Sequence, residues 1–432
     1  MKVSISGIRG IYGQDLSLHE VDKYSRLFAH SIKSGKCVIA RDTRPSGRII
    51  SQVLAAGLMS QGIDVYNLGI APTPAVFREA IKYGAGAIVT ASHNPLEWNG
   101  LKFVVEGRGL YEDELETMLK SSPGNSGKFG LEYAATSSYV DEIAALTRSN
   151  AKVKVGIDPG GGAACGFAEQ LFKNLGHQYF SVNGVPGISS RGPDPTADPL
   201  DDLRALATSN GLDLGFALDL DADRLVVVNS AGEKLNPDAT LLLCVARSLE
   251  LGMKKFVVSI DTSIAIEKYV RDRNGKVGHS KVGEANVVRK MLEENAEAGG
   301  EGSSAGFIMP RFNMCRDGLL AAATISTLEK KTIEECLAYA SQYAQIRSKI
   351  PADSSQHGAV IEKLQDVLKA DSTSIMTGDG VKAIVDEDSW ILVRPSNTEH
   401  AIRISVESKS GRAEQLFRKA SERVQSVYEQ VK

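Results

Sequence analysis

The chain has 432 residues, more than a single hydrophobic core usually serves, so we expect roughly two to four domains. Hydrophobic residues make up 42% of the chain and charged residues 24%, a balance typical of a folded globular protein and not of a disordered one. The formal net charge is −3 with lysine and arginine spread along the sequence, which excludes a strongly basic surface, so we expect neither a nucleic acid nor a membrane as partner.

The N-terminal segment MKVSISGIRG contains no apolar signal-peptide core, and no apolar run comes close to the ~20 residues of a membrane-spanning helix. The five cysteines are scattered and form no C-x-x-C pair of the kind that binds zinc or does redox chemistry. We therefore expect a cytoplasmic protein with reduced, mostly buried thiols. The cysteines are Cys37, Cys165, Cys244, Cys315 and Cys336.

One pattern occurs three times along the chain: an apolar strand ends on aspartate, a loop of small residues follows, and a helical pattern begins. The copies lie at residues 37–47 (CVIARDTRPSG), 153–163 (VKVGIDPGGGA) and 256–266 (FVVSIDTSIAI). A spacing of roughly 100 residues is too long for a solenoid repeat, but it suits three similar mixed α/β domains with largely parallel sheets. The glycine-rich residues 158–166 match neither the P-loop nor the G-x-G-x-x-G template, so we expect a turn that starts a helix.

The C-terminal part of the chain follows a different pattern. After about residue 344, short alternating strands surround a polar loop, and residues 411–431 show the apolar spacing of an amphipathic helix, so we predict a smaller α+β domain. Two breaker-rich loops, 121–130 and 183–199, fit this division, and the first precedes a helix expected near residues 139–149. The predicted domains are 1–135, 136–235, 236–345 and 346–432.

Residues 86–104, with the sequence GAIVTASHNPLEWNGLKFV, place polar side chains where a buried strand is expected to end. The apolar run leads into Ser92, His93 and Asn94, and Pro95 closes the loop. Most loop serines are capping or turn residues, and no G-x-S-x-G elbow supports acyl transfer. The role of this loop therefore depends on what else the fold brings to it.

A second polar loop, DLDADR, follows the apolar run GFAL. In an extended backbone Asp219, Asp221 and Asp223 would point to one side, and such carboxylates repel one another unless a hard cation such as Mg²⁺ binds them. A solvated acidic turn is the simpler alternative. An EF-hand loop is excluded, because Arg224 and Ser230 stand where glycine and glutamate are required. A haloacid dehalogenase-type phosphatase would use Asp219 as nucleophile, but it expects threonine or valine where Asp223 stands.

Three motifs together resemble the α-D-phosphohexomutase family: TASHNP at residues 90–95, NGLKF at 99–103 and DLDADR at 219–224. The resemblance covers the whole chain. Members of this family move a phosphoryl group between the 1- and 6-positions of a hexose or hexosamine through a phosphoserine and a hexose 1,6-bisphosphate intermediate. The resemblance implies four domains around a central cleft, Mg²⁺ as cofactor and a small-molecule sugar phosphate as partner. It leaves open whether the chain forms a homodimer.

The resemblance also assigns roles to individual residues. Ser92 is expected to carry the phosphoryl group, and Arg9, in SGIRG, to face the transferred phosphate. Lys102 is expected to help proton transfer. His93 lies close enough in sequence to share that transfer, and the alternative is that it only orients the loop. The expected magnesium ligands are Ser92, Asp219, Asp221 and Asp223.

Substrate-binding residues are implied in further segments. The loop GGEGSSAG, residues 299–306, is expected to meet the sugar hydroxyls, and a turn near residues 281–284 to face the substrate. Residues 394–404, RPSNTEHAIRI, are expected to hold the phosphate that is not transferred, because guanidinium and hydroxyl groups bind phosphate well. Taken alone, this last segment could equally be a polar hairpin. The predicted substrate-binding residues are Arg224, Gly283, Glu284, Glu301, Ser303, Arg394, Ser396, Asn397, Thr398 and Arg403.

Departures from the family pattern bear on the substrate. The sugar loop lacks the histidine of many bacterial relatives and resembles the G-G-E-G form of archaeal-type enzymes, so we predict a glucosamine phosphate as substrate, with glucose and mannose phosphates as alternatives. His400 stands where proline is common. Leu220 stands where glycine is common. Because leucine, unlike glycine, rarely adopts a positive φ, we expect a backbone without positive φ at this position. Two other classes remain alternatives: the phosphatase described above and a non-catalytic sugar-phosphate-binding protein.

Overall fold

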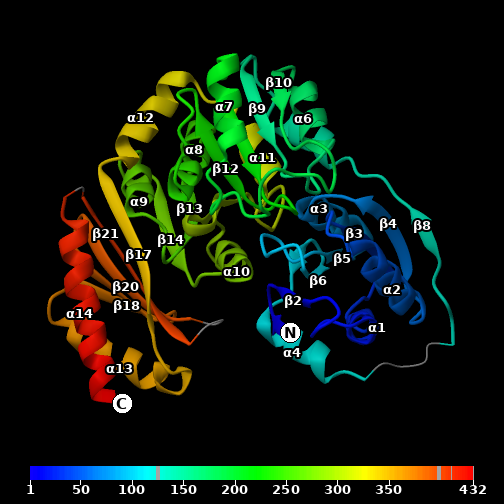
Figure 1. Cartoon of the computed structure of the whole chain (residues 1–432), viewed down its shortest axis with the longest axis horizontal. Helices are drawn as coiled ribbons and strands as arrows, with labels where there is room; N and C mark the ends of the chain where they lie inside the picture. The colour runs from blue at the N-terminus through cyan, green and yellow to red at the C-terminus, as the bar shows by residue number, and fades with distance from the viewer. Residues whose placement is uncertain (123–126, 397–399, 410, 432) are drawn as a thin grey trace.

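The computed structural model describes residues 1–122, 127–396, 400–409 and 411–431. Figure 1 shows three units of sheets and helices arranged in an arc, with a C-terminal sheet that lies beside the third unit and faces the first. The predicted fold class is confirmed: three α/β domains and a smaller C-terminal α+β domain surround a central cleft. In the part of the chain just defined, no helix is long and apolar enough to cross a lipid bilayer.

The first domain contains a sheet with the strand order β1-β2-β6-β5-β3-β4-β8, and β7 pairs with β6. Strand β5, with the sequence AGAIV, is buried along its whole length, as expected for the centre of a sheet that is covered on both faces. The strands are β1 (Lys2–Ser4), β2 (Gly7–Ile11), β3 (Lys36–Arg41), β4 (Asp64–Ile70), β5 (Ala85–Val89), β6 (Trp98–Val105), β7 (Arg108–Gly109) and β8 (Glu132–Ala134). The helices are α1 (Leu18–Ala29), α2 (Gly47–Met59), α3 (Thr73–Tyr83) and α4 (Glu112–Lys120).

The second and third domains have smaller sheets, ordered β10-β9-β11-β12 and β14-β13-β15-β16. The second comprises α5 (Tyr139–Leu146), β9 (Lys154–Asp158), α6 (Phe167–Leu175), β10 (Gln178–Ser181), α7 (Asp201–Asn210), β11 (Leu214–Leu218) and β12 (Leu225–Asn229). The third comprises α8 (Pro237–Glu250), β13 (Lys255–Ser259), α9 (Ile264–Arg271), β14 (Lys276–Ser280), α10 (Glu284–Glu294), β15 (Ala298–Glu301), η1 (Gly302–Ser304), β16 (Gly306–Ile308), α11 (Gly318–Ile325) and α12 (Lys330–Ala340).

The three sheets share one pattern of pairing. In each, a central strand (β3, β9 or β13) pairs in parallel with two neighbours, and the second neighbour (β5, β11 or β15) pairs with an antiparallel strand. The loop after that second neighbour therefore occupies an equivalent position in every domain. These loops are residues 90–97, 219–224 and 302–305, and each lies in or overlaps a segment to which the sequence analysis assigned a role in the chemistry.

The second and third domains share one apolar core. Helix α11, with the sequence GLLAAATI, has every residue buried, and it packs against α5, α6 and β12 of the second domain. A helix that is apolar on all sides has to be covered on all sides. The helix expected near residues 139–149 spans Tyr139–Leu146, and residues 183–199 form only an isolated bridge, as predicted.

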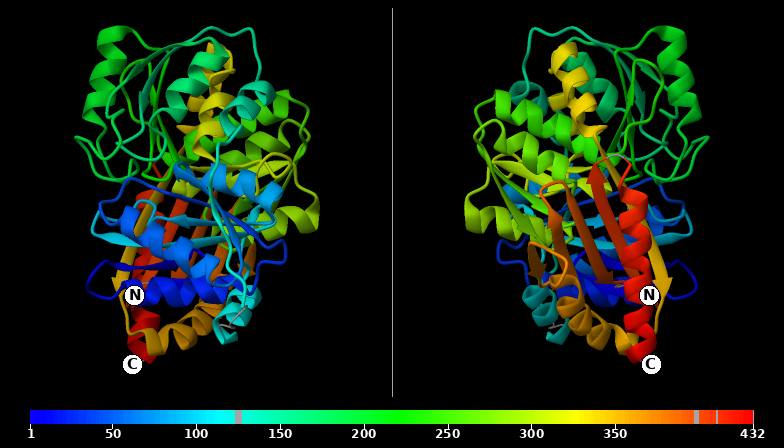
Figure 2. Two further views of the ribbon diagram at one scale, coloured as in Figure 1. Left: turned by 90° about the vertical axis from the view of Figure 1, so that its right-hand side faces the viewer. Right: turned by 90° about the vertical axis from the view of Figure 1, so that its left-hand side faces the viewer.

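The C-terminal domain is an antiparallel sheet with the order β17-β21-β20-β19-β18. Helices α13 and α14 cover one face of it (right-hand view of Figure 2), and the amphipathic helix predicted from residues 411–431 is confirmed. The elements are β17 (Tyr343–Pro351), η2 (Ser354–Gln356), α13 (His357–Lys369), β18 (Ser374–Thr377), β19 (Val381–Asp386), β20 (Ser389–Pro395), β21 (Ala401–Lys409) and α14 (Ala413–Val431).

A buried carboxyl group joins the C-terminal domain to the third domain. Glu407 on β21 is 1% exposed and accepts hydrogen bonds from Ser263 Oγ, from the Ile264 N–H at 2.7 Å and from Trp390 Nε1 at 2.7 Å. The first two donors form the N-terminus of α9, so Glu407 caps a helix of the neighbouring domain. Burial, and then the nearby Asp238 carboxylate, raises the pKa of Glu407 to about 7.

This raised pKa predicts a pH-dependent stability. The folded protein holds the proton of Glu407 more tightly than the unfolded chain, where the ordinary value is 4.5, so the contribution is complete below that value and is lost as the pH rises through about 7. We expect Glu407→Gln to remove about 2 kcal/mol of the decline in unfolding free energy between about pH 5 and 8. Urea denaturation of the original chain and of Glu407→Gln across this pH range measures the difference. If the unfolding free energies of the two proteins changed in parallel with pH, the assignment to Glu407 would be contradicted.

Candidate active site

The serine loop and the acidic loop meet although they lie far apart in the sequence. Ser92 is 1% exposed, and its Oγ donates a hydrogen bond to Asp219 Oδ2 at 2.9 Å. Ser92 has φ of 51°, a left-handed conformation that non-glycine residues adopt rarely and at a cost. Its N–H donates to Thr90 Oγ1 at 2.8 Å. The loop therefore presents one hydroxyl group to the acidic cluster in a constrained orientation.

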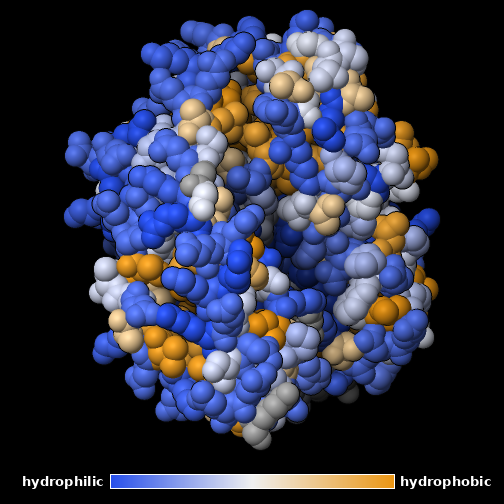
Figure 3. Space-filling model, turned by 60° about the vertical axis from the view of Figure 1, so that its left-hand side comes forward, coloured by the Kyte–Doolittle hydropathy of each residue, from blue (hydrophilic) through white to orange (hydrophobic). Residues whose placement is uncertain are grey.

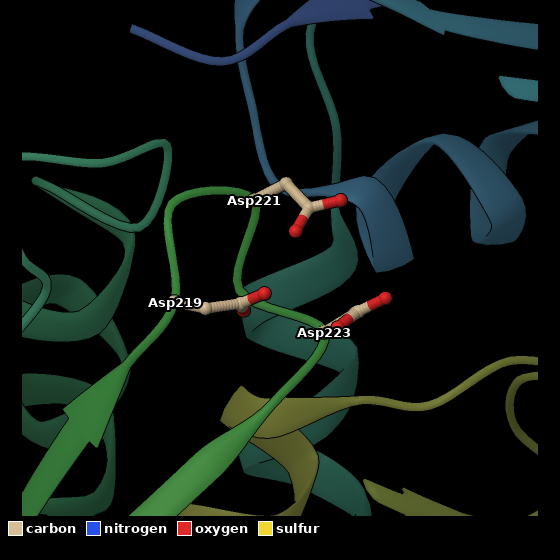
Figure 4. A group of neighbouring side chains, drawn as sticks. All are labelled: Asp219, Asp221 and Asp223. Atoms are coloured by element: carbon tan, nitrogen blue, oxygen red, sulfur yellow. The ribbon is translucent and has the colours of Figure 1, made fainter. Parts of the chain in front are cut away.

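The three aspartates lie on one tight turn (Figure 4). The expectation of an extended backbone is wrong: β11 ends at Leu218, and the chain turns between Asp219 and Asp223 through Ala222, whose φ is 61°. One oxygen from each carboxylate lies within 4.8 Å of the others. Asp221 Oδ1 and Asp223 Oδ1 are buried without a hydrogen-bond partner in the described part of the chain. Three buried and partly unpartnered carboxylates fit a hard divalent cation such as Mg²⁺.

Electrostatics distinguish the members of this cluster. The pKa of Asp219 lies well above its ordinary value, because burial disfavours the charged form and the Asp223 and Asp221 carboxylates add repulsion. Burial would also raise the pKa of Asp223, but nearby cations, Arg316 first, hold it below the ordinary range. The cluster therefore favours binding of positive charge, which removes the repulsion between neighbouring carboxylates.

His93 connects the serine to a cation. Its Nδ1 lies 3.3 Å from Ser92 Oγ, and its Nε2 lies 3.4 Å from an Arg224 guanidinium nitrogen. Burial, followed by the charge of Arg224, lowers the pKa of His93 to about 3. The imidazole is therefore neutral at physiological pH, and because a guanidinium can only donate, Nε2 accepts from Arg224 and Nδ1–H faces Ser92 Oγ.

A network of buried charges links the acidic loop to the sugar loop. Lys102 Nζ lies 2.9 Å from Glu284, and although burial lowers its pKa, the carboxylates of Glu284 and Asp223 outweigh burial and raise it. Arg316 lies 2.6 Å from Asp223, 3.2 Å from Glu301 and 3.5 Å from Glu284. Lys102 is therefore protonated, and Arg316 contacts three carboxylates from three segments of the chain.

These groups surround a cleft with a volume of about 630 Å³ between the domains. Figure 3, which is turned by 60° from the view of Figure 1, shows a hollow with a mainly hydrophilic wall near the middle of the face that it draws. Ser92 and the three aspartates lie buried beneath the cleft surface, and their neighbours reach into it. The predicted site residues that line the cleft are Arg9, His93, Lys102, Arg224, Gly283, Glu284, Glu301, Ser303, Arg394 and Arg403.

The C-terminal domain contributes cations to the opposite wall. Lys349, Arg403 and Arg394 are cross-strand neighbours on β17, β21 and β20, and all three line the cleft. Arg394 Nε donates to Asp379 Oδ1 at 3.1 Å. Ser396 is buried and is not among the residues that line the cleft. Asn397 and Thr398 lie outside the described residues.

Four models of one protein family match successive parts of the chain. Those of phosphoglucomutase/phosphomannomutase α/β/α domains I, II and III match residues 1–123, 137–232 and 236–344, and that of the C-terminal domain matches residues 346–423. The chain belongs to the phosphoglucomutase/phosphomannomutase family. It is therefore a phosphohexomutase-type enzyme.

Curated relatives in this family match the chain from end to end. A protein named probable phosphoglucosamine mutase from Methanothermobacter thermautotrophicus is 33% identical, over 99% of this chain and 97% of its own length. One with the same name from Pyrococcus horikoshii is 31% identical, over 98% of this chain and 97% of its own length. Each alignment therefore spans nearly the whole of both chains.

Solved structures share the fold. A phosphoglucomutase/phosphomannomutase family protein from Burkholderia thailandensis matches with a TM-score of 0.84 and 24% identity, over 100% of this chain and 98% of the other. The N-acetylphosphoglucosamine mutase of Aspergillus fumigatus, solved in complex with GlcNAc-6P and magnesium, matches with a TM-score of 0.58 and 13% identity, over 98% and 95% of the two chains. At these identities the likeness concerns the fold alone.

The family motifs did not indicate every residue in this cleft. Arg316, Arg347 and Lys349 line it, and Thr73 Oγ1 donates to Asp221 Oδ2 at 2.6 Å from the N-terminus of α3. The available signal for Arg316 was its position in NMCRDG, a charged pair between two apolar runs, where Asp317 caps α11. Arg347 and Lys349 alternate along β17, and charged residues that alternate along a strand are equally typical of an exposed sheet face, so the sequence did not mark them as site residues. Leu220, where glycine is common in the family, has no positive φ, as the sequence required. The positive φ of this turn is at Ala222.

Proposed function

We propose that the chain is a phosphoglucosamine mutase, which interconverts glucosamine 6-phosphate and glucosamine 1-phosphate through a phosphoserine at Ser92 and a 1,6-bisphosphate intermediate. One observation carries the proposal: Ser92 Oγ lies 2.9 Å from Asp219 in a buried three-carboxylate cluster at the base of a cleft lined with cations. A hydroxyl group in this position is suited to carry a phosphoryl group between substrate and enzyme.

The acidic loop supplies the proposed cation site. Asp219, Asp221 and Asp223 would hold Mg²⁺ together with Ser92, since their buried and partly unpartnered oxygens suit that ion. Bound there, Mg²⁺ would neutralise the charge on the phosphoryl oxygens during transfer.

The remaining residues of the first two domains would orient the phosphoryl group and move the proton. Arg9 and Arg224 line the cleft above Ser92 and would bind the phosphoryl oxygens. His93 lies 3.3 Å from Ser92 Oγ and 3.4 Å from an Arg224 nitrogen and would orient both groups, whereas Lys102, which lines the cleft, would exchange the proton of the attacking hydroxyl group.

The C-terminal cations would bind the other phosphate. Arg394 and Arg403 line the wall of the cleft, and guanidinium groups bind phosphate in a bidentate manner. A site that reads phosphate rather than sugar would accept the substrate in either orientation. This property is what a mutase requires, because its bisphosphate intermediate has to present each end in turn to Ser92.

The choice of glucosamine rests on the sugar loop and on the relatives. The loop GGEGSSAG lacks the histidine found in many bacterial relatives, and the two curated relatives described above are named probable phosphoglucosamine mutase. Glucose and mannose phosphates remain the alternative substrates, since the family description names both. Parallel assays of glucosamine, glucose and mannose 6-phosphates test the choice, and turnover of the last two with none of the first would overturn it.

A substitution in the sugar loop tests the role of that loop. Glu301 is buried, lines the cleft and lies 3.2 Å from Arg316. We expect Glu301→Gln to lower kcat/KM for glucosamine 6-phosphate by about 10- to 100-fold, because a charged hydrogen-bond acceptor is lost. Steady-state kinetics measures this, with Glu294→Gln on α10 as the exposed control. Equal kinetics of the two variants would exclude Glu301 from substrate binding.

A further inference from the structure

Two buried aspartate–arginine pairs occupy equivalent positions in the first and second domains. Asp42 follows β3 and Asp158 ends β9, and these are the central strands of equivalent sheets. Both aspartates belong to the strand, aspartate and loop pattern that recurs in the sequence. Asp42 pairs with Arg44 and Asp158 with Arg191, in each case through arginine Nε and at 3.0 and 2.8 Å. Neither pair has a role in the chemistry described above.

The first pair holds the serine loop. Both side chains of Asp42 and Arg44 are fully buried. The terminal nitrogens of Arg44 donate to the backbone carbonyl groups of the loop, at 2.5 Å to Ser92, 2.7 Å to Asn94, 2.5 Å to Pro95 and 2.8 Å to Trp98.

Asp42 completes the connection to the reactive residue. Its Oδ2 accepts a hydrogen bond from Thr90 Oγ1 at 2.7 Å, and Thr90 Oγ1 accepts one from the Ser92 N–H at 2.8 Å. The N–H and the C=O of Ser92 are therefore both bound, directly or through Thr90, to the same ion pair. These bonds stabilise the left-handed conformation of Ser92, which local sequence would not favour.

The second pair holds the acidic loop. A terminal nitrogen of Arg191 donates to the Leu218 carbonyl at 2.7 Å and to the Asp158 carbonyl at 3.1 Å, and Leu218 immediately precedes the first aspartate of the cluster. The glycine-rich turn supports the same loop, since the Ala163 N–H donates to the Leu220 carbonyl at 2.8 Å.

The sequence around the second pair fits this role. Gly160 has φ of 59°, and a Cβ atom there would lie 2.8 Å from the Arg191 guanidinium. Glycine is thus required both by the backbone and by the close approach of Arg191. Arg191 itself lies in the long loop 183–199. This loop supplies the guanidinium that contacts Leu218 at the start of the acidic loop, and the glycine-rich turn leaves the space for it.

We propose that Arg44 and Arg191 are positioning residues for phosphoryl transfer, each fixing the backbone of one loop so that Ser92 Oγ and the acidic cluster meet. Reactive groups on loops have to be held within about 0.5 Å of the productive geometry. Here the planar fork of donors that only arginine offers binds carbonyl groups of the serine loop and, at the second site, the carbonyl group of Leu218, where the acidic loop begins. The proposal deepens the proposed function. It rests on that function only for the test that follows the phosphorylation of Ser92, because metal binding can be measured without it.

Metal binding tests the second pair without substrate. We expect Arg191→Gln to weaken binding of Mn²⁺, titrated into the purified full chain and followed by electron paramagnetic resonance, by about 10- to 100-fold. Arg191→Lys should not restore it, because an ammonium group lacks the second donor in the required plane. The control is Arg204→Gln, which removes an exposed ion pair of the same domain. A folded Arg191→Gln protein with Mn²⁺ affinity within about 2-fold of the original chain would overturn the proposal.

Phosphoryl uptake tests the first pair. The full chain is incubated with glucose 1,6-bisphosphate and Mg²⁺, and the addition to Ser92 is followed by intact mass. We expect Thr90→Val, which is nearly isosteric and keeps the buried ion pair, to slow uptake by about 10-fold while Mn²⁺ affinity stays within about 2-fold. Arg44→Lys should slow uptake further if it folds. Uptake at the original rate in a folded Thr90→Val protein would exclude the link through Thr90, and uptake at the original rate in a folded Arg44→Lys protein would overturn the role of Arg44.

The two arms separate this proposal from the proposed function. An original chain that takes up no phosphoryl group would contradict the proposed function, whereas the Mn²⁺ titrations would still decide the role of Arg191. An original chain that is phosphorylated, with variants that behave like it in both arms, would support the function and refute the positioning role.

Discussion

Replacing Ser92 with alanine should reduce mutase turnover by about 10³-fold or more, because the phosphoryl group would lose its carrier between the two ends of the sugar. The hydroxyl group is the only part removed, and its hydrogen bond to Asp219 at 2.9 Å is lost with it. A coupled assay of glucosamine 1-phosphate formation measures the loss. Intact mass measures its cause, since the roughly 80 Da phosphoryl addition should be absent from the variant.

A serine outside the cleft provides the control for this substitution. Ser60 is the C-cap residue that follows α2, and its Oγ donates to the Gly57 carbonyl, so Ser60→Ala should keep full turnover and the phosphoryl addition. The haloacid dehalogenase-type alternative predicts a different result: a phosphatase that used Asp219 as nucleophile would still release inorganic phosphate after Ser92→Ala. Retained activity of either kind in the Ser92 variant would refute the phosphoserine mechanism.

Replacing Arg316 with glutamine should lower the unfolding free energy by about 3–5 kcal/mol at neutral pH, because the change leaves buried carboxylates without their shared cation. Arg316 contacts Asp223 at 2.6 Å, Glu301 at 3.2 Å and Glu284 at 3.5 Å, and its side chain is 12% exposed. Turnover should fall as well, since the same guanidinium joins the acidic loop to the sugar loop. Urea denaturation at constant metal concentration measures the stability.

The pH dependence of this loss follows from the pKa of Asp223, which nearby cations, Arg316 first, hold below its ordinary value against the effect of burial. A depressed pKa contributes stability above the unfolded value of 3.8, and that contribution is lost as the pH falls through the folded value. The unfolding free energies of the original chain and of Arg316→Gln should therefore differ less at acidic pH than at neutral pH. Arg289→Gln removes an exposed ion pair with Asp113 and should cost less than about 1 kcal/mol. Equal losses for both variants would contradict the role of Arg316.

The fold class and the principal motifs could be predicted from the sequence alone. The recurrence at residues 37–47, 153–163 and 256–266 predicted three similar domains, because strand periodicity and loop composition are local properties of the chain. Ser92 and the acidic loop were identified for the same reason, since side chains that carry a particular chemistry stand together in short motifs. The structure confirms the fold class and shows that Ser92 and Asp219, 127 residues apart, are in contact.

How these motifs contact one another could not be predicted from the sequence and depends on the packing of the domains. The extended backbone expected at the acidic loop is a turn through Ala222, because contacts from the glycine-rich turn and from α3 override the local alternation. Arg44, Arg191 and Arg316 act on segments that are distant in sequence, and a buried arginine has no local signature that distinguishes it from one on the surface. Their partners are set by three-dimensional packing, and burial makes the loss of either partner costly, because the remaining charge is left uncompensated.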